Sequence, residues 1–212
     1  MDRDFWLEKW EKNQLAFHEG APNTLLTAHF AKLGVPAGGT IFVPLCGKTL
    51  DMLWLRAQGY SVVGAELSRL AVEQFFAENG LTPTVTKAGW FERFESNGIT
   101  ILLGDLFELD DATLGPVAAV YDRAALVALP LAMRVRYAAY LIALTDGAPQ
   151  FLVTFEYDQT VMAGPPHAVP EAEVRKHYDA QYQLELAETR DVEGGLKGRC
   201  PATESAFLLK RL

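Results

Sequence analysis

The chain has 212 residues, 50% of them hydrophobic, which suits one globular domain with a single core. It carries 19 Lys and Arg against 27 Asp and Glu, a formal charge of −8 at pH 7. That sign disfavours a surface that collects nucleic-acid phosphates. We therefore expect one domain over residues 1–212 that does not bind nucleic acid.

The first residues, MDRDFWLEKWEKNQ, alternate charges with aromatics and lack the apolar centre of a secretory signal. No later run reaches the roughly 20 apolar residues that span a bilayer. Cys46 and Cys200 form no CxxC or Cys/His cluster, which argues against structural zinc and a disulfide framework. These features predict a cytoplasmic chain with reduced thiols, no membrane attachment and no metal.

The chain opens with a predicted amphipathic helix. Trp6 and Trp10 stand four residues apart, so a helix would place both indoles on one face. Phe17 and His18 follow in a loop. Further helices are predicted near residues 22–33, 50–55, 68–79, 133–144 and 171–178.

Apolar runs rich in β-branched residues predict the strands, at residues 40–46, 61–66, 99–105, 118–126, 150–158, 182–190 and 205–212. Strands that alternate with helices imply right-handed crossovers and a parallel sheet with helices on both faces. Only the glycine-rich turn at 193–198 separates the last two strands, which predicts an antiparallel hairpin. The insertion at 82–97 is a candidate for a short extra hairpin.

The turn after the first strand, PLCGKTLDM, is the first place to look for a ligand, because ligands bind beyond the carboxyl ends of the strands in such sheets. A P-loop would need a second glycine five residues before Gly47, where Phe42 stands. A dinucleotide site would need three glycines in GxGxxG, and this turn has one. A nucleoside cofactor without phosphates fits better, and S-adenosylmethionine is the commonest.

Two acidic residues end the next strands. Glu66 lies nineteen positions after Gly47, close to the roughly 20-residue offset at which a carboxylate binds ribose hydroxyls. The competing interpretation is a cap on the following helix. Asp105 ends the third strand and is a candidate for the adenine, through its carboxylate or the backbone of Asp105 and Leu106, or else a simple turn residue.

Several motifs at ordered spacings resemble one family. They are FWLEKW, AFHEG, PLCGK, VVGAELS, GDLF, YDRAALVALP and the GPP at residues 164–166. Together they resemble the thiopurine S-methyltransferase family, and specifically its bacterial branch, over nearly the whole chain. The resemblance implies an α/β Rossmann-like, seven-stranded class I methyltransferase sheet, mostly parallel with an antiparallel C-terminal strand and an N-terminal helical cover.

The resemblance also implies site residues. Those that line the S-adenosylmethionine site would be Trp10, Leu45, Glu66, Asp105, Leu106 and Arg123, in addition to Gly47, which the turn itself indicated. Trp6 and Phe17 match aromatic positions near the cofactor and the acceptor. The implied reaction is methyl transfer from S-adenosylmethionine to the sulfur of a small aromatic or heterocyclic thiol such as a thiopurine.

In-line methyl transfer depends mainly on positioning, which can supply roughly 7 to 11 kcal/mol. An indole face over the sulfonium adds about 0.5 to 2 kcal/mol, and Trp10, with Trp6, is the candidate; the alternative is that both anchor the helix. Arg123 follows Asp122 at the end of an apolar strand, where its charge would favour a thiolate acceptor. The alternative for Arg123 is an ion pair with a carboxylate such as Asp122.

Three other features have weaker assignments. Cys46 is interpreted as a packed thiol rather than a nucleophile. His18 is a candidate proton relay, although a lone loop histidine is more often structural or solvated. The loop at residues 158–170, rich in Gly and Pro, is a plausible lid.

Other functions stay open at this point. They are an NAD-dependent oxidoreductase that uses Glu66 on the ribose, a sensor that binds S-adenosylmethionine without catalysis, and a halide or thiocyanate methyltransferase. Selenium and tellurium compounds are further candidate acceptors, which would make the function metalloid detoxification. We expect a monomer, because no long apolar stripe is left uncovered.

Overall fold

The computed structural model describes residues 3–14 and 18–212, which form two compact units. The first holds residues 3–14, 18–23 and 35–119, and we call it the Glu66 unit. The second holds residues 24–34 and 120–212, and we call it the Arg123 unit. Each is described by itself.

The Glu66 unit is built on five strands in the order β3-β4-β5-β2-β1. Their bounds are β1 (Thr40–Pro44), β2 (Ser61–Glu66), β3 (Thr84–Ala88), β4 (Phe91–Ser96) and β5 (Ile99–Leu103). β1, β2 and β5 are parallel, whereas β4 pairs antiparallel with both β3 and β5. The helices are α1 (Arg3–Glu11), α3 (Asp51–Ala57), α4 (Arg69–Glu78) and α5 (Asp111–Leu114).

The sequence explains the parallel part of this unit. Ile41, Phe42 and Val43 of β1 are all buried, as expected for a strand covered on both faces. Ser68 caps α4, since its hydroxyl accepts the Ala71 N–H at 3.3 Å. Strand, turn and helix therefore follow each other where the sequence predicted them.

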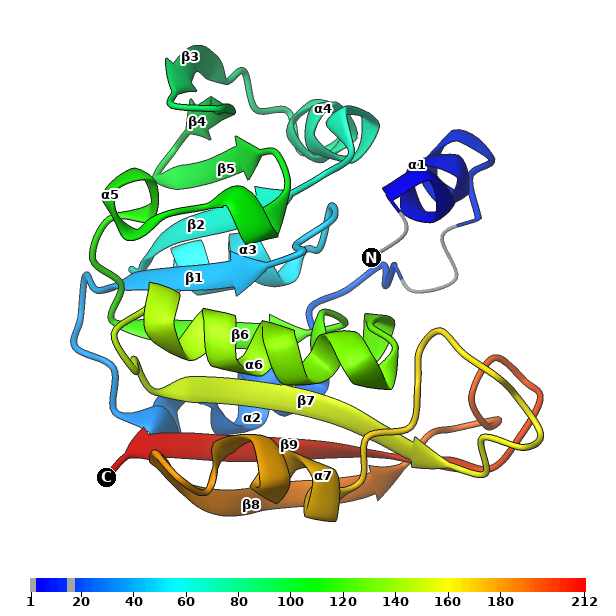
Figure 1. Cartoon of the computed structure of the whole chain (residues 1–212). Helices are drawn as coiled ribbons and strands as arrows, with labels where there is room; N and C mark the ends of the chain where they lie inside the picture. The colour runs from blue at the N-terminus through cyan, green and yellow to red at the C-terminus, as the bar shows by residue number, and fades with distance from the viewer. Residues whose placement is uncertain (1–2, 15–17) are drawn as a thin grey trace. The chain divides into compact units, whose positions relative to one another are not determined.

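The Arg123 unit contains four strands in the order β6-β7-β9-β8. Their bounds are β6 (Ala119–Arg123), β7 (Gln150–Tyr157), β8 (Tyr182–Asp191) and β9 (Ala202–Arg211). β6 and β7 are parallel, and β9 runs antiparallel between β7 and β8. α6 (Leu131–Leu144) and α7 (Glu171–Tyr178) lie on one face, with α2 (Thr24–His29) on the other (Figure 1).

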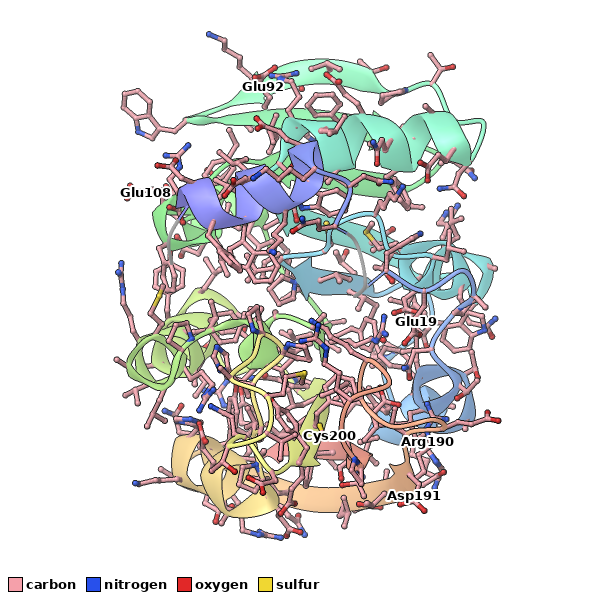
Figure 2. The ribbon with its side chains drawn as sticks, turned by 90° about the vertical axis from the view of Figure 1, so that its right-hand side faces the viewer. Glu19, Glu92, Glu108, Arg190, Asp191 and Cys200 are labelled. Atoms are coloured by element: carbon pink, nitrogen blue, oxygen red, sulfur yellow. The ribbon has the colours of Figure 1, made fainter. Side chains whose placement is uncertain are left out.

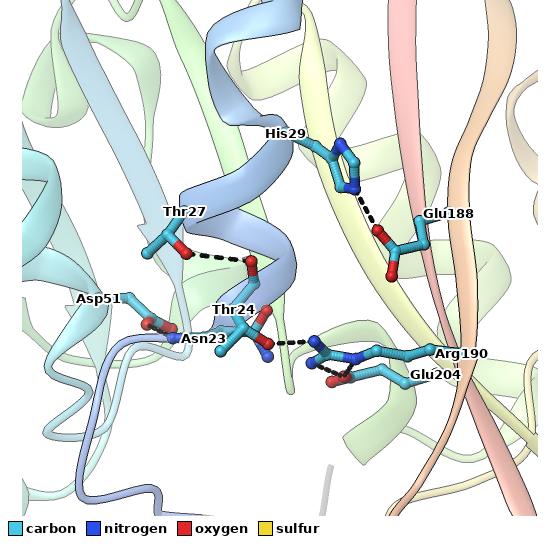
Figure 3. Close-up of polar contacts among 8 residues, drawn as sticks. All are labelled: Asn23, Thr24, Thr27, His29, Asp51, Glu188, Arg190 and Glu204. Atoms are coloured by element: carbon cyan, nitrogen blue, oxygen red, sulfur yellow. Dashed lines mark hydrogen bonds and ion pairs between the residues drawn. The ribbon is translucent and has the colours of Figure 1, made fainter.

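Polar contacts hold α2 to the last two strands (Figure 3). His29 Nε2 lies 2.5 Å from the Glu188 carboxylate on β8. Arg190 of β8 donates to the Thr24 hydroxyl and to Glu204 Oε2 of β9, the latter at 2.6 Å. A segment near the start of the chain is thus anchored to strands at its end.

The structure confirms the mostly parallel α/β fold with an antiparallel C-terminal strand, but corrects the strand count. Seven were predicted, whereas nine occur in the described residues. The difference is the predicted extra hairpin, β3 and β4, which joins the edge of β5 because Phe91 and Phe94 of β4 are buried.

Several short helices also differ from expectation. The helix predicted at 22–33 is divided into α2 and a 3₁₀ turn, η1 (Phe30–Leu33), which Gly34 ends at φ +73°. α5 and the 3₁₀ turns η2 (Leu106–Glu108) and η3 (Leu126–Ala128) were not predicted, because three or four residues are too few to show a period.

Both cysteines are buried free thiols. Cys200 of the Arg123 unit (Figure 2) packs in a small cluster with Met162, Leu196 and Ala202. None of the helices in the described ranges combines the length and apolarity that crossing a bilayer would need.

Candidate cofactor and acceptor site

The turn after β1 has an unusual backbone. Leu45 adopts φ +47° and Gly47 φ +53°, so two of three consecutive residues are left-handed. For Leu45 this conformation is costly, and such strain persists only where the surrounding structure enforces it. The Cys46 N–H donates to the Ala65 carbonyl at 3.0 Å, which ties the turn to β2.

Glu66, the last residue of β2, supports this turn directly. Its Oε2 accepts the Gly47 N–H at 2.8 Å and its Oε1 accepts the Ser68 N–H at 2.7 Å. The side chain is only 7% exposed, and this burial raises the pKa of Glu66, although the backbone N–H groups of Ser68, Gly47 and Leu67 act in the opposite direction. Glu66 therefore joins the ends of two neighbouring strands.

The Glu66 carboxylate retains the capacity to bind a ligand. Two carboxylate oxygens offer about four lone-pair sites, and the two N–H groups use two of them. The remaining acceptors match the two vicinal hydroxyls of a ribose. Neither contact is a cap on α4, which Ser68 provides; both support the turns around Glu66, and the ribose role stays a prediction.

Trp10 of α1 packs on the same turn. An added Cβ at Gly47 would lie 3.1 Å from Cζ2 of the indole, so the glycine permits this close approach. Trp10 is 4% exposed. The N-terminal helix therefore places one of its two tryptophans against the turn that follows β1.

The other aromatic candidates of this segment are less defined. Trp6 is partly buried and makes an edge contact with Phe5, with ring centroids 5.3 Å apart. Phe17 lies outside the described residues. His18 is described and partly buried.

Cys46 is a packed thiol, as the sequence indicated. A Cβ at Gly64 of β2 would lie 2.6 Å from Cys46 Sγ, so the thiol occupies the space that this glycine leaves. Burial, with the Glu66 charge in addition, raises the pKa of Cys46 well above its usual value. The group is therefore a neutral thiol rather than a nucleophilic thiolate.

Asp105 and Leu106 follow β5 at the same edge of the sheet. The Gly104 N–H donates to the Glu66 carbonyl at 2.9 Å, which brings the ends of β2 and β5 together. Asp105 Oδ1 accepts the Phe107 N–H at 3.0 Å and caps η2, while Leu106 is buried. Capping thus uses one Asp105 oxygen, and the adenine role stays a prediction.

Sequence reasoning missed two residues of this turn. Lys48 is buried, and its ammonium group lies 2.7 Å from Glu78 Oε1 on α4. Asp51, at the start of α3, accepts the Asn23 N–H at 2.7 Å (Figure 3). Lys48 was considered only as part of a P-loop, and a charged pair between distant residues leaves no local sequence signal.

Arg123 belongs to the other unit, where it ends β6 and is partly buried. The preceding Asp122 is fully buried, and its carboxylate accepts the Leu126 N–H at 3.1 Å and the Tyr137 hydroxyl at 2.7 Å. The structure therefore gathers Trp10, Leu45, Gly47, Glu66, Asp105 and Leu106 in one unit and Arg123 in the other. Within the described ranges, no group of three or more His, Cys, Asp or Glu side chains could hold a metal ion.

Solved structures with the same fold define the class. The magnesium protoporphyrin IX methyltransferase of Synechocystis, determined with bound S-adenosylhomocysteine, has a TM-score of 0.67 at 16% identity, covering 98% of this chain and 97% of its own. The 1,6-didemethyltoxoflavin-N1-methyltransferase of Burkholderia thailandensis has a TM-score of 0.64 at 15% identity, covering 98% and 87%. The fold is that of the S-adenosylmethionine-dependent methyltransferases.

Sequence comparison identifies the family within this class. The family model for thiopurine S-methyltransferase matches residues 1–203. The thiopurine S-methyltransferase of Xanthobacter autotrophicus is 54% identical over 212 residues and 100% of both chains, and that of Teredinibacter turnerae is 50% identical over 100% of this chain and 98% of its own. The chain belongs to the thiopurine S-methyltransferase family. These comparisons support neither a halide or thiocyanate methyltransferase nor an NAD-dependent oxidoreductase.

Proposed function

We propose that this enzyme transfers the methyl group of S-adenosylmethionine to the sulfur of a small aromatic or heterocyclic thiol such as a thiopurine. The observation that carries the proposal is the Glu66 carboxylate, which receives the Gly47 and Ser68 N–H groups and keeps acceptor sites for a ribose. The family match over residues 1–203 supports the reaction.

The cofactor would supply an electrophilic methyl group on a sulfonium. Glu66 would accept the ribose hydroxyls, and the edge formed by Asp105 and Leu106 would receive the adenine. Leu45 and Gly47 would bring backbone close to the ligand, with the indole of Trp10 facing the sulfonium. No phosphate enters this scheme, which agrees with the single glycine of the turn.

The acceptor side would depend on Arg123, with Trp6 and Phe17 as aromatic walls. A fixed guanidinium charge lowers the pKa of a nearby thiol and so favours the nucleophilic thiolate. Aromatic thiols ionise readily, so the enzyme needs no strong general base. Selenium and tellurium compounds are soft nucleophiles of the same kind and are candidate acceptors too.

Wider properties are proposed with the activity. We propose that both units act as one methyltransferase domain, supported by a family match that crosses both. We also propose a cytoplasmic monomer that acts on small molecules and binds neither nucleic acid nor membrane, in keeping with the charge of −8 and the free thiols. Light scattering of the purified chain tests the monomer.

The test is a radiolabelled methyl-donor assay of the full chain with a thiophenol, a thiopurine, a selenol, tellurite and iodide. We expect transfer to the thiols, and Arg123→Met should lower it while S-adenosylhomocysteine binding stays within about threefold. The matched control is Arg136→Met at an exposed site of α6. Absence of transfer to every thiol would refute the function, and equal activity of the Arg123→Met protein would remove Arg123 from it.

A further inference from the structure

A buried polar cluster lies under the end of β6, and the proposed chemistry does not use it. Asp122 is fully buried in β6, next to Arg123. Consecutive strand residues point to opposite faces, so the Asp122 side chain points away from that of Arg123. A carboxylate in this position does not meet a substrate, and its role must concern the protein itself.

Each Asp122 oxygen has its own partner. Oδ1 accepts the N–H of Leu126, four residues ahead in the chain, at 3.1 Å. Oδ2 accepts the hydroxyl of Tyr137, on α6, at 2.7 Å. The carboxylate therefore closes the turn that follows Arg123 and joins it to the helix packed over the sheet.

This turn has a backbone that needs such support. Ala124, directly after Arg123, has φ +65°, a left-handed conformation that is unfavourable for alanine. A residue of this kind is kept in place by the contacts around it. The Asp122 bond to Leu126 spans the residue and so restrains the backbone on which Arg123 is carried.

The same turn also holds the loop at 158–170. The Val127 carbonyl, in η3, accepts the His167 N–H at 2.6 Å. The loop is further anchored by the Tyr157 hydroxyl, which donates to the Pro166 carbonyl at 2.6 Å, and by Lys197, which donates to the Pro165 carbonyl at 2.7 Å. A displacement of the turn after β6 would therefore also displace the loop at 158–170, the predicted lid.

We infer that Asp122 and Tyr137 are positioning residues that fix the turn after β6. Through this turn they set the direction of the Arg123 guanidinium and the position of the 158–170 loop. The inference rests on the proposed role of Arg123 in acceptor binding. It assigns no contact with the substrate to either residue.

The titratable groups that face Asp122 are Tyr137 on α6 and Tyr178 on α7, and burial raises the pKa of both. Burial raises the pKa of Asp122 to about 6, against the lowering effect of the Tyr137 hydroxyl and the N–H groups of Leu126 and Ala125. Removal of the Tyr137 hydroxyl therefore raises the pKa of Asp122 further.

Tyr178 supplies a matched control. Its hydroxyl is also fully buried, yet in the described part of the chain it has no hydrogen-bond partner. Tyr137→Phe and Tyr178→Phe each delete one buried hydroxyl near Asp122, and only the first deletes a bond to the carboxylate.

The experiment compares both variants with the wild type in the full chain. For Tyr137→Phe we expect a fall of about 10- to 100-fold in kcat/KM for a thiophenol, the size associated with small misplacements of a reacting group. The acidic limb of its pH profile should move to higher pH, and amides of residues 123–128 should exchange hydrogen faster. Tyr178→Phe should match the wild type in all three.

A second variant covers the case in which Tyr137→Phe folds poorly. Protonation weakens the hydrogen bonds that Asp122 accepts from Leu126 and Tyr137, so we expect it to produce an acidic limb in the pH profile. Asp122→Asn keeps the size of the side chain but does not titrate, and it should abolish this limb. Wild-type pH profiles and exchange rates in both Tyr137→Phe and Asp122→Asn would overturn the inference. If the wild type methylates no thiol, the proposed function fails, and the exchange rates alone then decide whether these residues hold the turn.

Discussion

Each unit closes a strand-end turn with a buried carboxylate, and the two turns differ in what else the carboxylate can contact. In the Glu66 unit, the carboxylate accepts two backbone N–H groups and remains 7% exposed. In the Arg123 unit, Asp122 accepts the Leu126 N–H and the Tyr137 hydroxyl and is 0% exposed. The left-handed residues are Leu45 and Gly47 in the first turn and Ala124 in the second.

The comparison shows that a buried carboxylate at a strand end can have two different roles. A carboxylate that collects backbone N–H groups organises a turn in either place. Residual exposure and spare lone pairs are the reasons why we propose a ligand-binding role for Glu66 as well. Complete burial restricts Asp122 to the protein's own groups, so we assign it to positioning.

The largest expected effect is on the pH dependence of the free energy of unfolding, which the burial of Asp122 should cause. Its pKa rises from 3.8 to about 6 on folding, so between these pH values the folded protein retains a proton that the unfolded chain has released. The contribution of Asp122 to the free energy of unfolding is therefore fully present below pH 3.8 and is lost as the pH rises through about 6. A rise of this size corresponds to about 3 kcal/mol.

Asp122→Asn removes this dependence. Its free energy of unfolding relative to the wild type should increase by about 3 kcal/mol from pH 3 to pH 7 and then stay level, as measured by urea denaturation at several pH values. Asp179→Asn, at the exposed end of α7, is the control. A difference that does not vary with pH would show that Asp122 is not a buried titrating group, and the contrast with Glu66 would fail.

The second effect concerns the ligand side of the comparison. Glu66→Gln leaves one acceptor oxygen for two N–H donors, so one of them faces an amide NH₂ group. A hydrogen bond to a charged group is worth about 1.5 to 3 kcal/mol, so S-adenosylhomocysteine should bind about 10- to 100-fold more weakly by calorimetry. Glu73→Gln on the exposed face of α4 should bind normally. Unchanged affinity in Glu66→Gln would withdraw the ribose role.

The smallest effects are expected from substitutions of the left-handed residues, measured as changes in the free energy of unfolding. Ala124→Gly should change the free energy of unfolding by less than about 1 kcal/mol, because relief of the left-handed strain offsets the greater entropy of glycine in the unfolded chain. Gly47→Ala should cost more, since its φ is +53° and the new Cβ would lie 3.1 Å from Trp10. Urea denaturation of both variants measures the difference, and equal costs would show that the two turns are equally strained.

Local patterns were sufficient for most of the fold. The apolar run at 40–46 and the Ser68 cap predicted β1 and α4, because burial on two faces and capping leave direct marks in the sequence. The seven-strand count was wrong because no residue of β3 is buried, so its pairing depends on the buried face of β4. For the site, the offset from Gly47 to Glu66 predicted a ribose-binding carboxylate, and that role stays a prediction. The hydrogen bond from the Gly47 N–H to Glu66 was not predicted, because it joins residues on separate elements.

The alternation of strands and helices, the absence of phosphate-binding glycine patterns in the first turn and the resemblance to the family were determined by the sequence alone, because periodicity, glycine spacing and ordered motifs are properties of neighbouring residues. Only the tertiary structure decided that Glu66 supports the Gly47 turn, that Trp10 lies against it and that Asp122 binds Tyr137. These contacts join residues on separate elements, and folding of the backbone is what brings them within hydrogen-bond or packing distance.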